Sequence, residues 1–323
     1  MASEPRSRAS YDGARMIDPY ETFDGSFPFA PHFSSASGFR MHYIDEGRGE
    51  PIVCLHGEPT WGYIYRKFVP ELAKHWRVIV PDHMGFGKSD TPQDKTYTLE
   101  THVNNLAALI DELGLSGITF VGQDWGGPML TAYTVRHPER VARICLLNSI
   151  CGYGAMVAPR DAPRPPKLHE SDWFRWVRAA EADGSYYERM QDLGNHVADL
   201  IGRLGCATGL DETAVRAYAA PFTSPDECKG AVEFPLDVAL NRIGDYVKGG
   251  ASGVPALRSK PAMLAEGMLD KAIPPALAIA DFRALFPDGT LTELEHAAHF
   301  CQEDAAPELV ELIKRFMQAH AAA

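Results

Sequence analysis

Three side chains capable of hydrolytic chemistry follow apolar segments of the chain: Asp124, Asp270 and His299. Asp124 lies at the centre of GQDWG (122–126), where small residues on both sides permit a tight turn from a strand into a helix. A carboxylate there can displace a leaving group from an sp³ carbon, whereas a serine would attack an acyl carbon. The pattern therefore predicts a nucleophile that acts on haloalkanes or epoxides. A plain turn with Asp124 as a helix N-cap is the competing interpretation.

A histidine and a second carboxylate complete the expected set. His299 follows the last apolar segment, and an imidazole is suited to deprotonating water near neutral pH. His296, in the same HAAHF motif, is the alternative base. Asp270 follows the expected strand 262–266 and precedes His299 in the chain, which suits it to orient the imidazole. The alternative position for this acid, just after the expected strand 144–147, carries Asn148, which cannot supply a negative charge.

The loop HGEPTW (56–61) follows another apolar strand. A loop at this place can supply one backbone N–H of an oxyanion hole, and the residue after the nucleophile can supply the other. We expect the backbone N–H groups of Glu58 and Trp125 to form this hole. Arg66 and Lys67 are interpreted as surface charges. The run QED (302–304) is interpreted as the first turn of the closing helix, where negative charge is favourable.

Short β-branched runs alternate with amphipathic segments, which predicts an α/β fold with a mostly parallel central sheet flanked by helices. Expected strands are 39–45, 52–55, 78–80, 118–121, 144–147, 261–266 and 290–294, and expected helices are 63–74, 99–113, 129–136, 275–286 and 307–320. The proline-rich stretch VAPRDAPRPPK and the short helical patterns after it predict a helical insertion. We therefore expect a core at 1–151, a helical cap at 152–235, and the rest of the core at 236–323.

The composition excludes several classes of protein. Lys+Arg 31 against Asp+Glu 43 gives a net charge of −12, which argues against nucleic-acid or anionic-membrane partners. No apolar run is long enough to cross a membrane. The six cysteines show neither paired nor metal-type spacing, and the N-terminal residues lack the apolar core of a signal peptide. We expect free thiols, no metal site and a cytoplasmic protein.

These motifs together resemble the haloalkane dehalogenases of the α/β-hydrolase superfamily. The resemblance rests on HGEPTW, PDHMGFGKSD, QDWGGP, AYAAPF, GMLD and HAAHF, and it covers nearly the whole chain after residue 30. It implies an α/β-hydrolase fold with the cap inserted after strand 6, Asp124 as nucleophile, His299 as base and Asp270 as its partner. It also implies two halide donors: the indole of Trp125 and, in the subgroup with HGEPTW, a cap tryptophan, with Trp176 preferred over Trp173. Another subgroup uses an Asn at the place of Glu58.

The same resemblance implies a small apolar halogenated substrate, water and halide as partners, no cofactor, and a monomer or small homo-oligomer. An epoxide hydrolase could use the same triad with cap tyrosines as donors to the epoxide oxygen, and the candidates are Tyr153, Tyr186, Tyr187 and Tyr218. A non-catalytic relative that serves as a binding protein is the remaining alternative. Such relatives usually lack a member of the triad, and all three positions are filled here.

Overall fold

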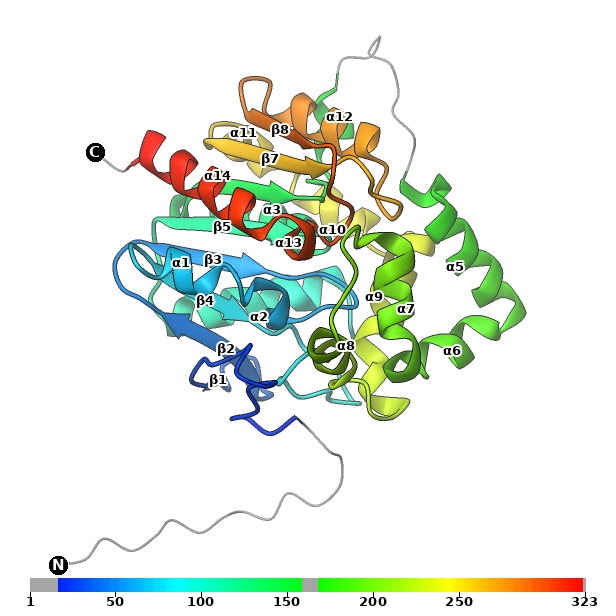
Figure 1. The fold of residues 1–323 in the computed structure, drawn as a ribbon. Coiled ribbons are helices and arrows are strands. Elements are labelled where there is room, and N and C mark those ends of the chain that lie inside the picture. The colour runs from blue at the N-terminus through cyan, green and yellow to red at the C-terminus, as the bar shows by residue number, and fades with distance from the viewer. Residues whose placement is uncertain (1–16, 159–167, 322–323) are drawn as a thin grey trace, which may run out of the picture.

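An eight-stranded sheet forms the centre of the computed structural model, which describes residues 17–158 and 168–321 (Figure 1). The strands are β1 (His32–Ser34), β2 (Met41–Glu46), β3 (Pro51–Leu55), β4 (Arg77–Pro81), β5 (Ile118–Gln123), β6 (Val141–Leu147), β7 (Ala262–Gly267) and β8 (Thr290–Leu294). Their spatial order is β1-β2-β4-β3-β5-β6-β7-β8. Strand β2 pairs antiparallel with both neighbours and every other pairing is parallel, as the alternation of patterns predicts.

The expected strands all occur, with ends shifted by a few residues, and the three-residue β1 is an addition that its length made hard to predict. The expected helix 63–74 is wrong as a single element. It divides into a 3-10 helix, η1 (Gly62–Tyr65), and a short helix, α1 (Val69–Leu72). Pro70 lies at the start of α1, where its missing N–H is tolerated, but the same proline could not sit inside a continuous helix without losing a hydrogen bond.

Helices cover both faces of the sheet. The core helices are α2 (Leu99–Glu112), α3 (Gly126–Thr134), α12 (Pro275–Leu285), α13 (Cys301–Asp304) and α14 (Ala306–Ala319). In Figure 1, α14 and α1 lie in front of the sheet and α3 lies behind it. Helix α14 presents a buried apolar stripe with helical spacing that includes Leu309, Ile313 and Phe316.

The described part of the chain between β6 and β7, residues 148–158 and 168–261, is mostly helical. It contains α4 (Gly154–Val157), η3 (Leu168–Glu170), α5 (Asp172–Asp183), α6 (Ser185–Met190), α7 (Leu193–Gly205), α8 (Glu212–Ala219), η4 (Asp226–Cys228), α9 (Lys229–Ala239), α10 (Gly244–Gly249), η5 (Ala251–Gly253) and α11 (Val254–Arg258). A further 3-10 turn, η2 (Pro138–Arg140), precedes β6. Helices α5–α9 lie beyond the carboxyl ends of the strands (Figure 1). The expected cap boundary at residue 235 falls inside α9.

Side-chain hydrogen bonds mark the ends of these helices. Ser171 caps α5 by accepting from the N–H of Phe174, and α5 ends at Gly184, whose φ of 82° is the left-handed conformation that glycine adopts easily.

Across the described ranges, no helix is long and apolar enough to cross a membrane. All six cysteines are buried as free thiols. The described residues contain no group of three or more His, Cys, Asp or Glu side chains that could hold a metal ion.

Candidate active site

The turn between β5 and α3 holds Asp124 in a strained conformation, with φ of 51°. Neighbouring backbone leaves room only for glycine on both sides of it. A Cβ at Gly126 would lie 2.3 Å from the carbonyl oxygen of Leu55, and a Cβ at Gly122 would lie 2.8 Å from the carbonyl carbon of Gly126. The glycines of the motif therefore have the steric role that the sequence suggested, and the turn places Asp124 just beyond the carboxyl end of β5.

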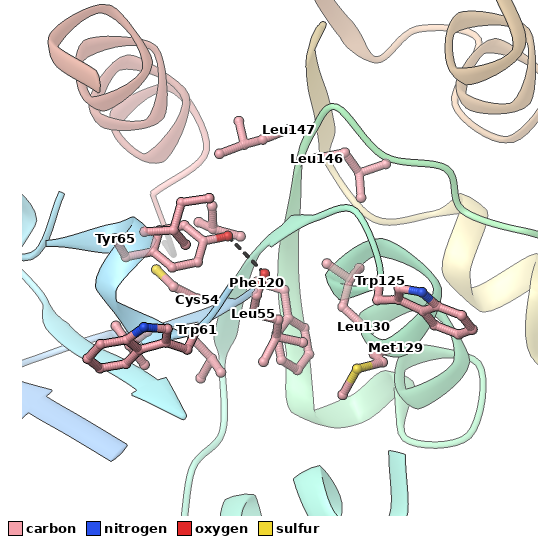
Figure 2. Packing of buried hydrophobic residues seen from close by; sticks show 14 of the residues in the cluster. Cys54, Leu55, Trp61, Tyr65, Phe120, Trp125, Met129, Leu130, Leu146 and Leu147 are labelled. Carbon is pink, nitrogen blue, oxygen red and sulfur yellow. Dashed lines mark hydrogen bonds between the residues drawn. The ribbon is translucent and has the colours of Figure 1, made fainter. Parts of the chain in front are cut away.

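The loop after β3 contacts the carboxylate of Asp124. The backbone N–H of Glu58 donates to Asp124 Oδ1 at 2.9 Å. A Cβ at Gly57 would lie 2.2 Å from the same oxygen, so only glycine permits this approach. The Tyr65 hydroxyl donates to the carbonyl of Leu55 at 2.9 Å and fixes the end of β3 beside the turn, as Figure 2 shows. The loop thus supplies one of the two expected backbone donors, and the other, Trp125, is the N-cap residue of α3.

His299 and Asp270 meet Asp124 from the far end of the sheet. His299 Nδ1 lies 2.8 Å from Asp270 Oδ2, and His299 Nε2 lies 3.5 Å from Asp124 Oδ2. Asp270 is held by backbone N–H groups of Ala272 and Ile273, which donate to its Oδ1 at 2.7 Å and 2.9 Å. The structure therefore brings together the three side chains that the sequence singled out. His296 lies apart from them, exposed and 3.4 Å from Glu308.

Asn148 and Gln123 complete the polar surroundings of this group. The amide of Asn148 donates to Asp270 Oδ2 at 2.9 Å, so the residue at the alternative acid position supports Asp270 by a hydrogen bond. Gln123 Nε2 lies 3.2 Å from the carbonyl oxygen of His299. Both side chains are fully buried, and both limit the rotation of the groups that they contact.

Opposing effects act on the pKa of His299. Burial disfavours the charged imidazole, but the carboxylates of Asp270 and Asp124 favour it more strongly, so the net pKa is raised. The imidazolium form of His299 is therefore favoured beside these two side chains. Loss of the negative charge on Asp124 would remove one of these two contributions and lower the pKa of His299.

Two further carboxyl groups lie close to the triad and were not assigned a side-chain role from the sequence. Glu58 is buried, its Oε1 has no hydrogen-bond partner in the described chain, and burial followed by the charge of Asp124 raises its pKa well above the ordinary value. Among the described residues neither side-chain oxygen of Glu266, at the end of β7, has a hydrogen-bond partner, and burial and Asp270 raise its pKa. The protonated form of both groups is therefore favoured relative to an exposed glutamate. Only the tertiary structure shows this burial.

A pocket of about 300 Å³ opens in front of Asp124 and Trp125. Most of its wall is apolar and comes from α5, from the segment after β6, and from residues 238–248, with Phe174 and Val238 as examples. The indole of Trp125 stacks on Phe234 of α9, with ring centroids 4.5 Å apart and planes 13° apart. An apolar wall of this kind strengthens electrostatic interactions inside it and favours a small apolar ligand.

The expected second halide donor, Trp176, does not reach this pocket. Trp176 stacks on Trp173 at 5.1 Å, and both face a separate pocket between α5, α6 and α7. Phe174 of the same helix lines the pocket of Asp124 instead. Successive helical residues point about 100° apart, so positions 173 and 176 share one face and position 174 lies on another. The expectation that Trp176 or Trp173 joins Trp125 as a halide donor is therefore corrected: in this orientation of α5 neither of them lines the pocket of Asp124.

The four candidate tyrosines differ in their surroundings. Tyr186 donates to the carbonyl of Val232 at 2.7 Å, and Tyr218 donates to Glu303 Oε1 at 2.6 Å, so both hydroxyls are already bonded. Tyr187 is exposed. Tyr153 alone of the four lines the pocket of Asp124. The structure therefore does not favour a pair of cap tyrosines that donate to an epoxide.

The acidic run before α14 is structural rather than a simple helix start. Glu303 lies in the separate helix α13, where it is buried and forms a two-pronged ion pair with Arg66, with Nη2 to Oε2 at 2.9 Å. Tyr218 of α8 donates to the same carboxylate. Arg66 is therefore a buried partner and the expectation of a surface charge was wrong, because a spacing of 237 residues hides the pair. Lys67 is half-exposed and also contacts Glu303.

A comparison with known protein families identifies the family to which this chain belongs. A sequence profile of the α/β hydrolase fold matches residues 50–306. The chain belongs to the α/β-hydrolase family. The predicted fold class is thereby confirmed, and the observed sheet order agrees with it.

Two kinds of curated relative match most of the chain. A cis-3-alkyl-4-alkyloxetan-2-one decarboxylase of Shewanella oneidensis is 32% identical over 300 residues, covering 91% of this chain and 90% of the relative. A protein named haloalkane dehalogenase 2 from Mycobacterium bovis is 32% identical over 296 residues, covering 90% of this chain and 96% of the relative. The resemblance to haloalkane dehalogenases that the motifs indicated is confirmed by this similarity.

Solved structures of haloalkane dehalogenases share the fold. The tetrameric structure of DpaA from Paraglaciecola agarilytica has a TM-score of 0.71 and 30% identity, covering 89% of this chain and 92% of the other. DbeA from Bradyrhizobium elkani has a TM-score of 0.77 and 25% identity, covering 91% of this chain and all of the other. The similarity therefore extends through both the sheet and the helices inserted after β6.

Proposed function

We propose that the protein hydrolyses haloalkanes to an alcohol and halide through a covalent ester on Asp124. The observation that carries this proposal is a carboxylate nucleophile at the β5–α3 turn, facing an apolar pocket and 3.5 Å from a His299–Asp270 pair. Dehalogenase relatives that cover about nine-tenths of the chain support the choice of substrate class. We further propose that residues 152–235 act as the cap over this pocket.

In the first step, one oxygen of Asp124 attacks the halogen-bearing carbon and the halide leaves into the pocket. The N–H of Glu58 holds Oδ1, which fixes the direction of the carboxylate. The indole N–H of Trp125 is the proposed halide donor, because it donates without accepting and lies in a largely apolar wall. The carbon–halogen bond breaks as the ester bond forms, and the charge passes from the carboxylate to the halide.

In the second step, His299 removes a proton from water, and the resulting hydroxide attacks the ester carbonyl. Before it can do so, His299 must be neutral: formation of the ester removes the charge of Asp124 and lowers the pKa of His299, so the imidazolium releases its proton to solvent and becomes the general base. Asp270 stabilises the imidazolium that forms. The N–H groups of Glu58 and Trp125 receive the oxyanion, and collapse of the intermediate releases the alcohol and regenerates Asp124. The scheme uses water as the only co-substrate and calls on no metal or cofactor.

A second candidate function follows from the decarboxylase relative, which matches 91% of this chain. An oxetan-2-one is a strained four-membered lactone. Asp124 could attack the sp³ ring carbon that is bonded to the ring oxygen, not the carbonyl carbon. The C–O bond would break and free a carboxylate. Loss of CO₂ from that carboxylate would then form an alkene and restore Asp124. The same nucleophile serves both reactions, and the released product distinguishes them.

The test is a parallel assay of purified protein. Bromide release from 1-bromobutane and 1,2-dibromoethane, lost in Asp124→Asn and Asp124→Ala, is the outcome expected for a dehalogenase. Alkene and CO₂ from a cis-dialkyl oxetan-2-one without bromide release would transfer the assignment to the second candidate. Diol formation from styrene oxide alone would contradict both. The subgroup with HGEPTW, the cytoplasmic location and the monomeric or small oligomeric state stay predictions that this assay does not address.

A further inference from the structure

The backbone on both sides of His299 is held by two other segments of the fold. The N–H of Ala298 donates to Asp304 Oδ2 at 2.9 Å, and the N–H of Phe300 donates to the carbonyl of Gly205 at 2.8 Å. Asp304 is the last residue of α13, and Gly205 is the last residue of α7. The loop that carries the imidazole, which we call the histidine loop (residues 297–300), is therefore bonded on one flank to α13 and on the other to α7.

The contact between the end of α7 and the histidine loop is close. A Cβ at Gly205 would lie 2.7 Å from the backbone nitrogen of His299 and 2.7 Å from the Cβ of Ala298. A larger residue at position 205 would therefore push the loop away. Because closely packed segments transmit displacements, a shift of this end of α7 moves the backbone of His299 as well.

Asp304 joins the histidine loop to a second segment near α7. Its Oδ2 accepts from the N–H of Ala207 at 3.0 Å as well as from that of Ala298. Its Oδ1 accepts from the N–H and from the hydroxyl of Thr208, both at 2.9 Å. Ala207 and Thr208 belong to the loop between α7 and α8, residues 206–211. One carboxylate thus links the histidine loop to a loop of the proposed cap.

The carboxylate of Asp304 is well placed to act as a fixed acceptor. Helix α13 is anchored at the preceding residue, because Glu303 pairs with Arg66 and accepts from Tyr218. Ala298 is only 3% exposed, so its N–H has little access to water as an alternative partner. A hydrogen bond from a buried N–H to a carboxylate is among the stronger ones in proteins. Its loss would therefore loosen the residue directly before the imidazole.

We propose that Asp304 is a positioning residue, which fixes the imidazole of His299 for hydrolysis of the ester and couples it to the loop between α7 and α8. This inference rests on the proposed function. In the second step, His299 Nε2 must face the attacking water while Nδ1 stays 2.8 Å from Asp270. A small misplacement of such a group is costly to the rate. Attack by Asp124 in the first step does not use the imidazole, so the effect is confined to the second step.

Single-turnover experiments with 1-bromobutane separate the two steps. Bromide release reports attack by Asp124, and mass spectrometry of the intact protein reports loss of the butyl ester. Asp304→Ala should leave the rate of attack within about two-fold and slow ester hydrolysis about ten-fold, so that the ester accumulates. Asp304→Asn keeps one acceptor oxygen and should recover part of the lost rate. Thr208→Val removes only an exposed hydroxyl and should slow hydrolysis by less than about three-fold.

Asp211→Ala is the matched control for a loss of stability. Asp211 lies at the other end of the same loop, where it accepts from the N–H of Ala214 at 2.7 Å and caps α8. Among the described residues it has no hydrogen bond to the histidine loop. Its loss should lower the melting temperature, as the loss of a helix cap does, and leave the rates of both steps unchanged. Equal slowing of ester hydrolysis in Asp211→Ala and Asp304→Ala would identify general destabilisation and overturn the positioning role.

Hydrogen exchange gives a readout that needs no substrate. Exchange of the backbone amides of residues 297–300 should be faster in Asp304→Ala than in the parent, and unchanged in Asp211→Ala. Unchanged exchange in Asp304→Ala, or ester hydrolysis at the parent rate, overturns the positioning role while bromide release still supports a dehalogenase. Faster exchange in Asp304→Ala, in a protein whose parent form releases no bromide, supports the link between Asp304 and the histidine loop and contradicts the dehalogenase function.

Discussion

The strand ends of the sheet and helix α5, in the proposed cap, differ in how well the sequence predicts where their side chains point. Asp124, Asp270 and His299 come from positions up to 175 residues apart, yet the sheet brings them within hydrogen-bond or ion-pair distance. In α5, Trp176 lies two residues from Phe174 and faces a different pocket. A parallel sheet fixes where strand ends lie, whereas a helix turns its side chains about 100° per residue. A residue of functional type in a helix can therefore point away from the site.

The largest expected effect is on the core side of this comparison. His299→Gln should leave attack by Asp124 possible and stop hydrolysis of the ester, which lowers turnover about 10³-fold or more. Mass spectrometry of the intact protein after incubation with 1-bromobutane should show a butyl adduct. Asp124→Ala is the control and should form no adduct. Normal turnover by His299→Gln would remove His299 from the mechanism.

The junction between core and cap gives the next largest effect. Glu303→Gln leaves the buried Arg66 without its carboxylate and weakens the bond from Tyr218, so unfolding free energy should fall by about 3 kcal/mol. Urea denaturation measures this change. Glu311→Gln, on the exposed face of α14, is the control and should change stability by less than about 0.5 kcal/mol. Equal effects of both variants would mean that the buried Arg66–Glu303 pair and its bond from Tyr218 do not stabilise the fold.

The two tryptophan positions test the comparison directly. Trp125→Phe removes an indole N–H at the pocket and should weaken bromide binding about ten-fold, the loss of one hydrogen bond to a charged group. Trp176→Phe should change bromide binding by less than about two-fold, because its ring faces the other pocket. Bromide inhibition of 1-bromobutane hydrolysis measures both. A comparable loss in Trp176→Phe would require a different orientation of α5 in the halide-bound protein.

The smallest effect concerns the buried carboxyl of Glu58. Its pKa is raised in the folded protein, so the folded state binds this proton more tightly than the unfolded state does, and stability falls as pH rises from the ordinary glutamate range to the raised pKa. Glu58→Gln has no such proton and keeps the backbone N–H that holds Asp124. Its melting temperature should therefore gain on that of the parent between pH 5 and pH 8. A gap that is constant with pH would show that Glu58 titrates normally.

Much of the core was predictable because local sequence rules act there. The turn at Asp124 needs glycine on both sides for steric reasons, and the alternation of strands and helices predicts a parallel sheet. The positions of Asp124, Asp270 and His299 then follow from the ends of β5, β7 and β8. Whether these residues perform the proposed steps stays a prediction for the experiments above.

By itself, the sequence determined the α/β fold, the insertion of helices after β6 and the identity of the residues at the strand ends, because these depend on short-range patterns. Only the tertiary structure decided which face of α5 meets the pocket and that Arg66 and Glu303 pair across 237 residues. These features depend on how helices rotate and pack against distant segments. Such packing depends on contacts between segments that are far apart in the chain, so no periodic pattern in the sequence reveals it.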